Sequence, residues 1–411
     1  MLNKSFFLSM FALLFVFSIE VKSDINKAWD LFKTNNLKDA YTECDNIINS
    51  NSKDRTDALI LMSIISDISY DYNQSIKLFK EIFNSKEDIN PYFSSIFLSN
   101  SVAAIPEYDN DALIELFEDL LQTDKLNSTN KAWLCEFLAK NYRYKGKIKK
   151  ADEYGSMIGG VYDWQVLGCF DNISESGFDA DFGAIKHPEA DYKFTDKNGA
   201  EIKWFDIVKP LNGRWVNLKN YFITSNSIIY AQTFCNSPAD LNGQIRVGTS
   251  GSLKVWVNDK LVISESEERN NGLDTYISPI NLKAGNNRIV LQVGSSEINS
   301  SNFFVRITDN KGTPVTNLTY TTQSTNYPKV GGEDLTMQSN FAEDYFNKQI
   351  TSNPSNLNNY MLLANCYIIN SKSSHAKEVL DKAIKLAPES TYILYQLMQV
   401  FYILNNRTDY S

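Results

Sequence analysis

The spacing of apolar residues changes twice along the chain. From residue 24 to about 160 the apolar positions recur at intervals of three and four, which predicts amphipathic helices. From Trp164 to about Ile307, short apolar runs are separated by turn residues, a pattern typical of β-strands. The helical spacing returns near residue 340. The pattern therefore predicts a helical region, an all-β region and a second helical region.

One segment of the second helical region matches the tetratricopeptide pattern of large and small residues. Two antiparallel helices approach closely only where small residues face each other, here Ala364 and Ala376. The predicted packing residues of this hairpin are Tyr360, Leu363, Ala364, Tyr367, Ala376, Leu380, Ala383 and Pro388. The alternative is an ordinary helical hairpin that matches by chance. Repeats of this kind act as binding scaffolds, so the pattern favours interaction over chemistry.

The same spacing of small residues occurs elsewhere. Four pairs are separated by 12 positions: Ala28 and Ala40, Ser63 and Ser75, Ala139 and Ala151, and Ala364 and Ala376. Residues 24–160 are therefore interpreted as degenerate tetratricopeptide-like repeats. Ala342 lies 34 positions before Ala376, which is one repeat length, so residues 340–411 are interpreted as further repeat helices. Residues 391–405 would form a helix without its partner, and we therefore expect a truncated chain.

The β-region contains recognisable strands and turns. The clearest predicted strands are 245–247, 253–257, 260–263, 288–293 and 303–307. Asn258 and Asp259 suit a tight hairpin because both residue types tolerate positive φ. A second turn is predicted around Gly285. Both faces of the segment 253–257 are apolar, which predicts a strand inside a two-layer sandwich.

Several ordered segments of the β-region resemble a known kind of domain. They are Trp164–Asn172, Gly177–Asp179, His187–Glu189, Lys203–Trp204, Gly251–Asn258 and Leu282–Asn287. Together they resemble a galactose-binding-like jelly-roll sandwich of large exported bacterial proteins, notably of Bacteroidota. In that family the sandwich lies between tetratricopeptide repeats, and a transglutaminase-like, papain-type domain follows. The family usually has Pro where this chain has Cys169.

The resemblance implies a domain organisation but no catalytic residues. The expected parts are a signal peptide (1–23), repeat-like helices (24–160), a β-sandwich (161–325), a linker (326–339) and tetratricopeptide helices (340–411). A papain-type site needs a Cys nucleophile, a His base and an orienting acid. His187 and His375 have no Cys in a suitable motif, so no catalytic residue is carried over.

The N-terminus has the features of a secretory signal. Lys4 supplies the charge, an almost unbroken apolar stretch runs from Phe6 to Ile19, and small residues stand at a cleavage position after Ser23. Cleavage would change the formal net charge from −9 to −10, because two lysines and one glutamate are lost. An acidic chain without a dense basic stripe is a poor nucleic-acid binder. We expect an exported protein, periplasmic or extracellular, with no stable membrane insertion after cleavage.

The cysteines and acidic residues give little support for metal binding. The five cysteines form no CxxC pair, and neither histidine has ligand spacing. Cys169 and Cys235 lie in the β-region and could form a bridge, although buried packing thiols are the simpler interpretation. A hard cation such as calcium is an alternative for one acidic loop, which holds Asp171, Glu175, Asp179 and Asp181. No cofactor is expected.

The β-region also contains aromatic residues that could form a sugar-stacking platform. They are Trp204, Trp215, Trp256, Tyr221 and Tyr230. Trp256 follows the strand alternation and is interpreted as a core residue. Trp215 follows the polar turn Asn212-Gly213-Arg214 and is the candidate for ligand contact.

The sequence thus predicts a tetratricopeptide-type α-solenoid interrupted by an all-β jelly-roll sandwich. The leading functional hypothesis is a non-catalytic exported scaffold that binds a protein or peptide along its helical surface. One alternative is a carbohydrate-binding module protein that holds a glycan in the sandwich. Another is the N-terminal fragment of a transglutaminase-like hydrolase that lacks its catalytic domain.

Overall fold

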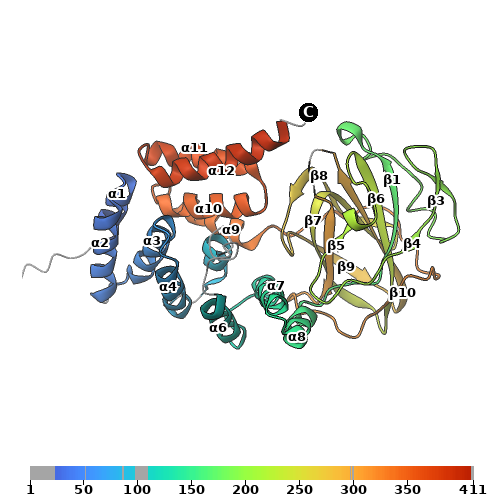
Figure 1. Cartoon of the computed structure of the whole chain (residues 1–411), viewed down its shortest axis with the longest axis horizontal. Helices are drawn as coiled ribbons and strands as arrows, with labels where there is room; N and C mark the ends of the chain where they lie inside the picture. Colours follow the sequence, from blue (N-terminus) through green and yellow to red (C-terminus); the bar gives the residue numbers. More distant parts are fainter. Residues whose placement is uncertain are drawn as a thin grey trace, which may run out of the picture.

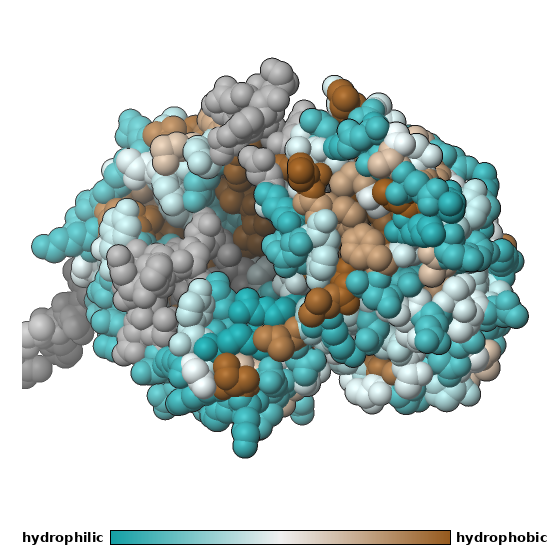
Figure 2. Space-filling view, turned by 45° about the vertical axis from the view of Figure 1, so that its right-hand side comes forward, coloured by the Kyte–Doolittle hydropathy of each residue, from teal (hydrophilic) through white to brown (hydrophobic). Residues whose placement is uncertain are grey.

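The structure, a computed structural model, describes residues 24–50, 52–85, 88–97, 110–296, 298 and 300–408. Helices from both ends of the chain lie together on one side, and the β part lies on the other (Figure 1). The surface between the two parts is hollowed, and apolar side chains are visible in and beside the hollow (Figure 2). The predicted signal segment lies outside the described residues.

The first helical segment consists of short helices with recognisable ends. Asp24 caps the first helix by accepting from the backbone N–H of Asn26 at 2.9 Å, and Gly159, with a φ of +76°, ends the last. The helices are α1 (Ile25–Lys33), α2 (Leu37–Asn49), α3 (Arg55–Ile68), α4 (Tyr72–Ser85), α5 (Asn90–Tyr92), a short π-helix (Phe93–Phe97), α6 (Asn110–Leu121), α7 (Ser128–Tyr144) and α8 (Ile148–Ile158).

The β part is dominated by one antiparallel sheet of ten strands, accompanied by a two-stranded ribbon of β2 and β3. The order along the sheet is β4-β1-β6-β10-β7-β11-β5, with β8 and β9 also paired to β7 and β12 paired to β6. The strands are β1 (Gln165–Asp171), β2 (Phe194–Thr195), β3 (Glu201–Ile202), β4 (Phe205–Asp206), β5 (Val216–Asn217), β6 (Ser227–Ser237), β7 (Leu241–Val257), β8 (Lys260–Asn270), β9 (Tyr276–Leu282), β10 (Gly285–Ser295), β11 (Asn302–Thr308) and β12 (Thr319–Thr321).

The predicted jelly-roll sandwich of two layers is wrong, because the main sheet is continuous and curls on itself. The predicted strands 245–247 and 253–257 are two halves of β7, whose 17 residues pair with four other strands. Its first half lies between β9 and β11, and its second half lies between β10 and β8. The register shifts between Gly251 and Leu253, and Gly251 has a φ of +133°. A bulge of this kind bends a strand, so a single strand can serve both sides of the curl.

The predicted hairpin at Asn258 and Asp259 is confirmed. Both residues have positive φ, 54° and 62°, and Val257 pairs with Lys260 across the turn. Such a two-residue turn twists in the sense that antiparallel strands require. The turn that joins β9 to β10 likewise places Gly285 at a φ of +91°.

The tetratricopeptide solenoid is also wrong, because helices from both ends of the chain form one core. The second helical segment consists of α9 (Phe341–Ser352), α10 (Leu357–Ile369), α11 (Ser373–Leu386) and α12 (Thr391–Thr408). The ring of Phe32 lies 6.1 Å from that of Tyr392, and the ring of Tyr92 lies 5.6 Å from that of Phe346. In a solenoid each repeat contacts only its sequence neighbours. Here the two segments share a single apolar cluster.

The helices do pair as antiparallel hairpins where the sequence placed small residues. Ala28 packs at the α1–α2 contact and Ala139 at the α7–α8 contact, and both are buried. None of the helices in the described ranges is both long enough and apolar enough to span a membrane.

Candidate functional site

The residues predicted from the repeat pattern are packing residues. Those from Tyr360 to Tyr367 lie on α10, and those from Ala376 to Ala383 lie on α11. All seven are buried in the helical core, whereas Pro388 is exposed just after α11 ends. The two helices pack against each other, so these side chains stabilise the hairpin and offer no surface to a ligand.

The aromatic residues predicted as a platform do not come together as one surface. Trp204 and Tyr230 are buried, and the indole N–H of Trp204 donates to the His187 carbonyl at 2.9 Å. Trp256, interpreted from the sequence as a core residue, is half-buried against a small apolar cluster. Trp215 and Tyr221, both half-exposed, line the same groove.

This groove, the Trp215 groove, has a volume of about 650 Å³ and lies between α7 and the β part. One face of α7 contributes three charged side chains at helical spacing, Glu136, Lys140 and Arg143. The remaining lining residues come from the loop before β5, from β5 itself, from the turn after it and from the start of β11: Val208, Lys209, Pro210, Leu211, Gly213, Arg214, Trp215, Val216, Asn217, Asn220, Tyr221 and Asn302.

Two glycines allow the loop to rest on the α7–α8 hairpin. A Cβ on Gly155 would lie 2.4 Å from the Asn212 carbonyl oxygen, and one on Gly213 would lie 2.9 Å from the Gly155 Cα. Gly213 also has a φ of +73°, which other residues adopt at a cost. Its N–H donates to the Tyr162 hydroxyl at 2.6 Å, and the Arg143 guanidinium donates to the Asn212 carbonyl at 3.3 Å. The loop therefore has a defined position on the helices.

Trp215 is held in the groove by Glu136 and by the sheet. Its indole Nε1 donates to Glu136 Oε1 at 2.6 Å, and its ring centroid lies 5.8 Å from that of Phe304. A Cβ at Gly248 would lie 2.5 Å from Trp215 Cη2, so the glycine makes room for the indole. Burial raises the pKa of Glu136 to about 6, although the Trp215 hydrogen bond and the charge of Lys140 lower it. The pKa of this carboxyl group therefore lies nearer to neutral pH than that of an ordinary glutamate.

The lining of the groove is basic, although the whole chain is acidic. Arg143 pairs with Asp152 at 3.1 Å and Lys209 with Asp163 at 2.8 Å. Lys140 and Arg214 make no ion pair within the described part of the chain, and both are exposed.

Two buried polar atoms of the groove also lack partners. The Arg143 Nε and the Asn302 Oδ1 have no hydrogen-bond partner among the described residues. Buried polar atoms are nearly always paired, but these two have almost no accessible surface, so they lie within the wall and not in the open groove. The groove itself therefore offers positive charge and an aromatic face.

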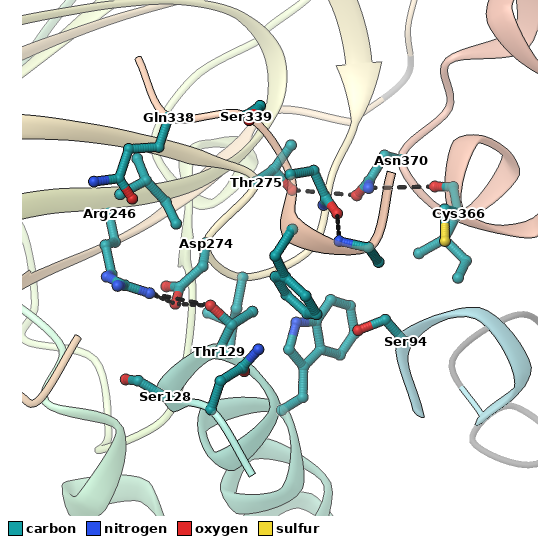
Figure 3. Close-up of a pocket in the computed structure, with 18 of the residues that line it drawn as sticks. Ser94, Ser128, Thr129, Arg246, Asp274, Thr275, Gln338, Ser339, Cys366 and Asn370 are labelled. Carbon is teal, nitrogen blue, oxygen red and sulfur yellow. Dashed lines mark hydrogen bonds and ion pairs between the residues drawn. The ribbon is translucent and has the colours of Figure 1, made fainter. Parts of the chain in front are cut away.

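A second, smaller cavity of about 200 Å³ lies where both helical segments meet the sheet (Figure 3). Asp274 is buried at its wall and accepts from Arg246 at 2.9 Å, from Arg306 Nε at 2.7 Å and from Thr129 at 2.9 Å. Burial would raise the pKa of Asp274, but the two guanidinium groups outweigh burial and lower it. On the opposite side Thr275 donates to Asn370, the residue that follows α10, at 3.3 Å. These contacts join the helices to the sheet.

The acidic loop does not form a cation site. Asp179 pairs with Lys254 at 2.5 Å, and Asp181 pairs with Lys186 at 2.6 Å. Within the described ranges no three His, Cys, Asp or Glu side chains are grouped as metal ligands would be. Asp179 and Asp181, each paired with a lysine, therefore contribute to local structure.

The cysteines and histidines are separate from each other. All five cysteines are free, including Cys169 and Cys235, and four are buried while Cys169 is half-buried. Burial raises the pKa of the Cys235 thiol to about 12. Burial also raises the pKa of each of the other four thiols. His187 stacks on Tyr192 at 3.6 Å between ring centroids, and His375 lies beside Tyr367. Neither histidine is hydrogen-bonded to a cysteine in the part of the chain that the structure describes.

The sequence singled out Trp215 but not the helical side of its groove. The available signal was the spacing of Glu136, Lys140 and Arg143, which places three charges on one helical face. Nothing in that spacing indicates that the loop with Trp215, 79 positions after Glu136 in the chain, covers this face of α7.

Comparison with known proteins gives no functional assignment. No protein-family profile matches the chain, and no curated protein matches it. A β-glucosidase from Kluyveromyces marxianus aligns over 36% of this chain and 16% of its own, with 14% identity and a TM-score of 0.23. An anti-sigma factor domain-containing protein from Clostridium clariflavum aligns over 41% and 49%, with 12% identity and the same TM-score. The chain thus spans about a sixth of the glucosidase and half of the second protein, and scores this low carry no argument.

Proposed function

We propose that this chain is a binding protein whose Trp215 groove takes an acidic carbohydrate. The observation that carries the proposal is the local reversal of charge: four cations and one carboxylate line the groove of a chain with a net charge of −9. Lys140 and Arg214 lack an ion pair among the described residues. Their charge favours an anionic ligand.

The other lining groups suit a sugar. A half-exposed indole presents a flat face to the C–H surface of a saccharide, and its hydrogen bond to Glu136 holds that face in place. The side-chain amides of Asn217, Asn220 and Asn302 can donate to and accept from hydroxyl groups. A guanidinium such as that of Arg214 pairs with a carboxylate in a bidentate manner. The groove thus has a partner for each part of a uronic acid unit.

The proposal is binding rather than cleavage. Most glycoside hydrolases use two carboxyl groups, one as acid and one as base or nucleophile. Glu136 is the one carboxylate among the described residues that line the groove. Its raised pKa would instead make binding depend on pH, because the groove gains positive charge as Glu136 is protonated below about pH 6.

The experiment is calorimetric titration with oligogalacturonate and with its neutral methyl ester. We expect the acid to bind and the ester to bind at least tenfold more weakly, a difference of about 1.4 kcal/mol. Trp215→Ala and Arg214→Gln should each weaken binding of the acid, whereas Tyr192→Ala and Lys385→Gln, matched changes of exposed residues elsewhere, should not. Equal affinity for acid and ester, or binding unaffected by Trp215→Ala, would contradict the proposal.

A second candidate function, a protein partner, is favoured by a separate observation. Helix α12 exposes five large apolar side chains on one face. Exposed apolar patches of this kind mark interaction surfaces.

For both functions we retain export as a proposal. N-terminal sequencing of the secreted protein should find Asp24 as the first residue.

A further inference from the structure

Helix α12 carries a continuous apolar stripe on its outer face. The α12 stripe consists of Leu394, Tyr395, Met398, Phe401 and Tyr402, which are between 44% and 69% exposed. At 100° per residue these five positions fall within about 120° of the helix circumference. The stripe is therefore one surface and not a set of scattered residues.

The other side of α12 is already occupied. Ile393 and Val400 are fully buried in the shared helical core, and Gln396 donates to the Met361 carbonyl at 3.0 Å. Because α12 has one buried face and one apolar exposed face, it has the composition of a helix that is covered on both sides. Single exposed apolar residues are common on proteins, but a contiguous group of five is not.

We infer that the α12 stripe is the contact surface between two copies of this chain. The inference does not depend on the Trp215 groove. In a twofold contact each surface meets its own copy, so a charged surface would repel itself. From Thr391 to Asn406 the sequence has no charged residue, although the chain as a whole carries a net charge of −9. The stripe itself thus places no like charges opposite each other, and Asp67 of α3 lies near Tyr395 at its edge and not at its centre.

The area of the stripe suits a weak dimer. If each large side chain has a surface area of roughly 200 Å², the exposed fractions of the five residues amount to about 500 Å² of accessible surface per copy. Two copies would bury about 1,000 Å² in total, which is the lower end for a specific interface. Met398 stands at the middle of the stripe, so it should lie close to the twofold axis and contact Met398 of the other copy. We expect a dissociation constant in the micromolar range.

Sedimentation equilibrium of the purified protein tests this inference. The wild-type protein should be a dimer at about 100 µM and should dissociate on dilution. Met398→Glu should weaken the dimer at least thirtyfold, because it places two carboxylates near the axis. The matched control is Leu386→Glu, an acidic change at an exposed leucine on α11, which should leave the dimer unchanged. Thermal unfolding of both variants should match the wild type.

Cross-linking gives an independent readout. Met398→Cys should form a disulfide-linked dimer under mild oxidation, whereas Leu386→Cys should not. A monomeric wild type at 100 µM would overturn the inference and leave the stripe to an unrelated partner. A dimer that survives Met398→Glu would overturn it as well, because the contact would then lie elsewhere.

Discussion

Replacing Glu136 by Gln should stabilise the protein at neutral pH. In the wild type the Trp215 indole Nε1 lies 2.6 Å from Glu136 Oε1. Gln keeps an oxygen that can accept this N–H, but its side chain cannot ionise. The pKa of Glu136 is raised from 4.5 to about 6 by burial, against the opposing effects of Trp215 and Lys140. One pKa unit corresponds to about 1.4 kcal/mol, so ionising this carboxyl group in the folded protein costs about 2 kcal/mol.

The sign follows from proton binding. Between about pH 4.5 and pH 6 the folded protein holds the Glu136 proton more tightly than the unfolded chain does, so the free energy of unfolding falls as the pH rises. Above pH 6 the full cost is present. Glu136→Gln should therefore be more stable than the wild type by up to about 2 kcal/mol at pH 7.5. Near pH 4.5 the difference should almost vanish.

Urea unfolding followed by tryptophan fluorescence and circular dichroism measures this difference at the two pH values. The control is Glu153→Gln on the exposed surface of α8, which should change stability little at either pH. The reasoning is refuted if Glu136→Gln is less stable than the wild type at pH 7.5. It is also refuted if the two proteins differ equally at both pH values, because the effect would then not come from ionisation.

Three further outcomes are expected. Asp274→Asn should destabilise the protein by about 3–5 kcal/mol in urea unfolding, because it leaves Arg246 and Arg306 buried without their carboxylate; an effect below 1 kcal/mol would count against the ion pairs. Ala376→Trp overpacks the α10–α11 contact, and limited proteolysis should then cleave both helical segments, since they share one core; cleavage confined to residues 341–408 would contradict this. Thiol titration should be slow, with Cys169 reacting first because it is the one cysteine that is not fully buried; a fast thiol at any other position would disagree with the structure.

The sequence alone determined those features that depend on residues close together in the chain, such as helix contacts within a hairpin and tight turns. Ala364 and Ala376 are fully buried at a helix contact because no larger side chain lets two helices approach so closely. Asn258 and Asp259 form the turn because both residue types accept positive φ. Trp215, expected to be exposed beside a polar turn, is half-exposed.

The tertiary structure decided which surfaces meet. Apolar spacing shows which face of a helix is buried, but it does not show what covers that face. Phe32 and Tyr392 lie 360 positions apart and pack together, so the helices form one core and not a solenoid. The sequence likewise indicated two strands, 245–247 and 253–257, whereas backbone pairing makes them one. Glu136 becomes a groove residue, with a raised pKa, because the fold brings a distant loop and its indole over the carboxyl group.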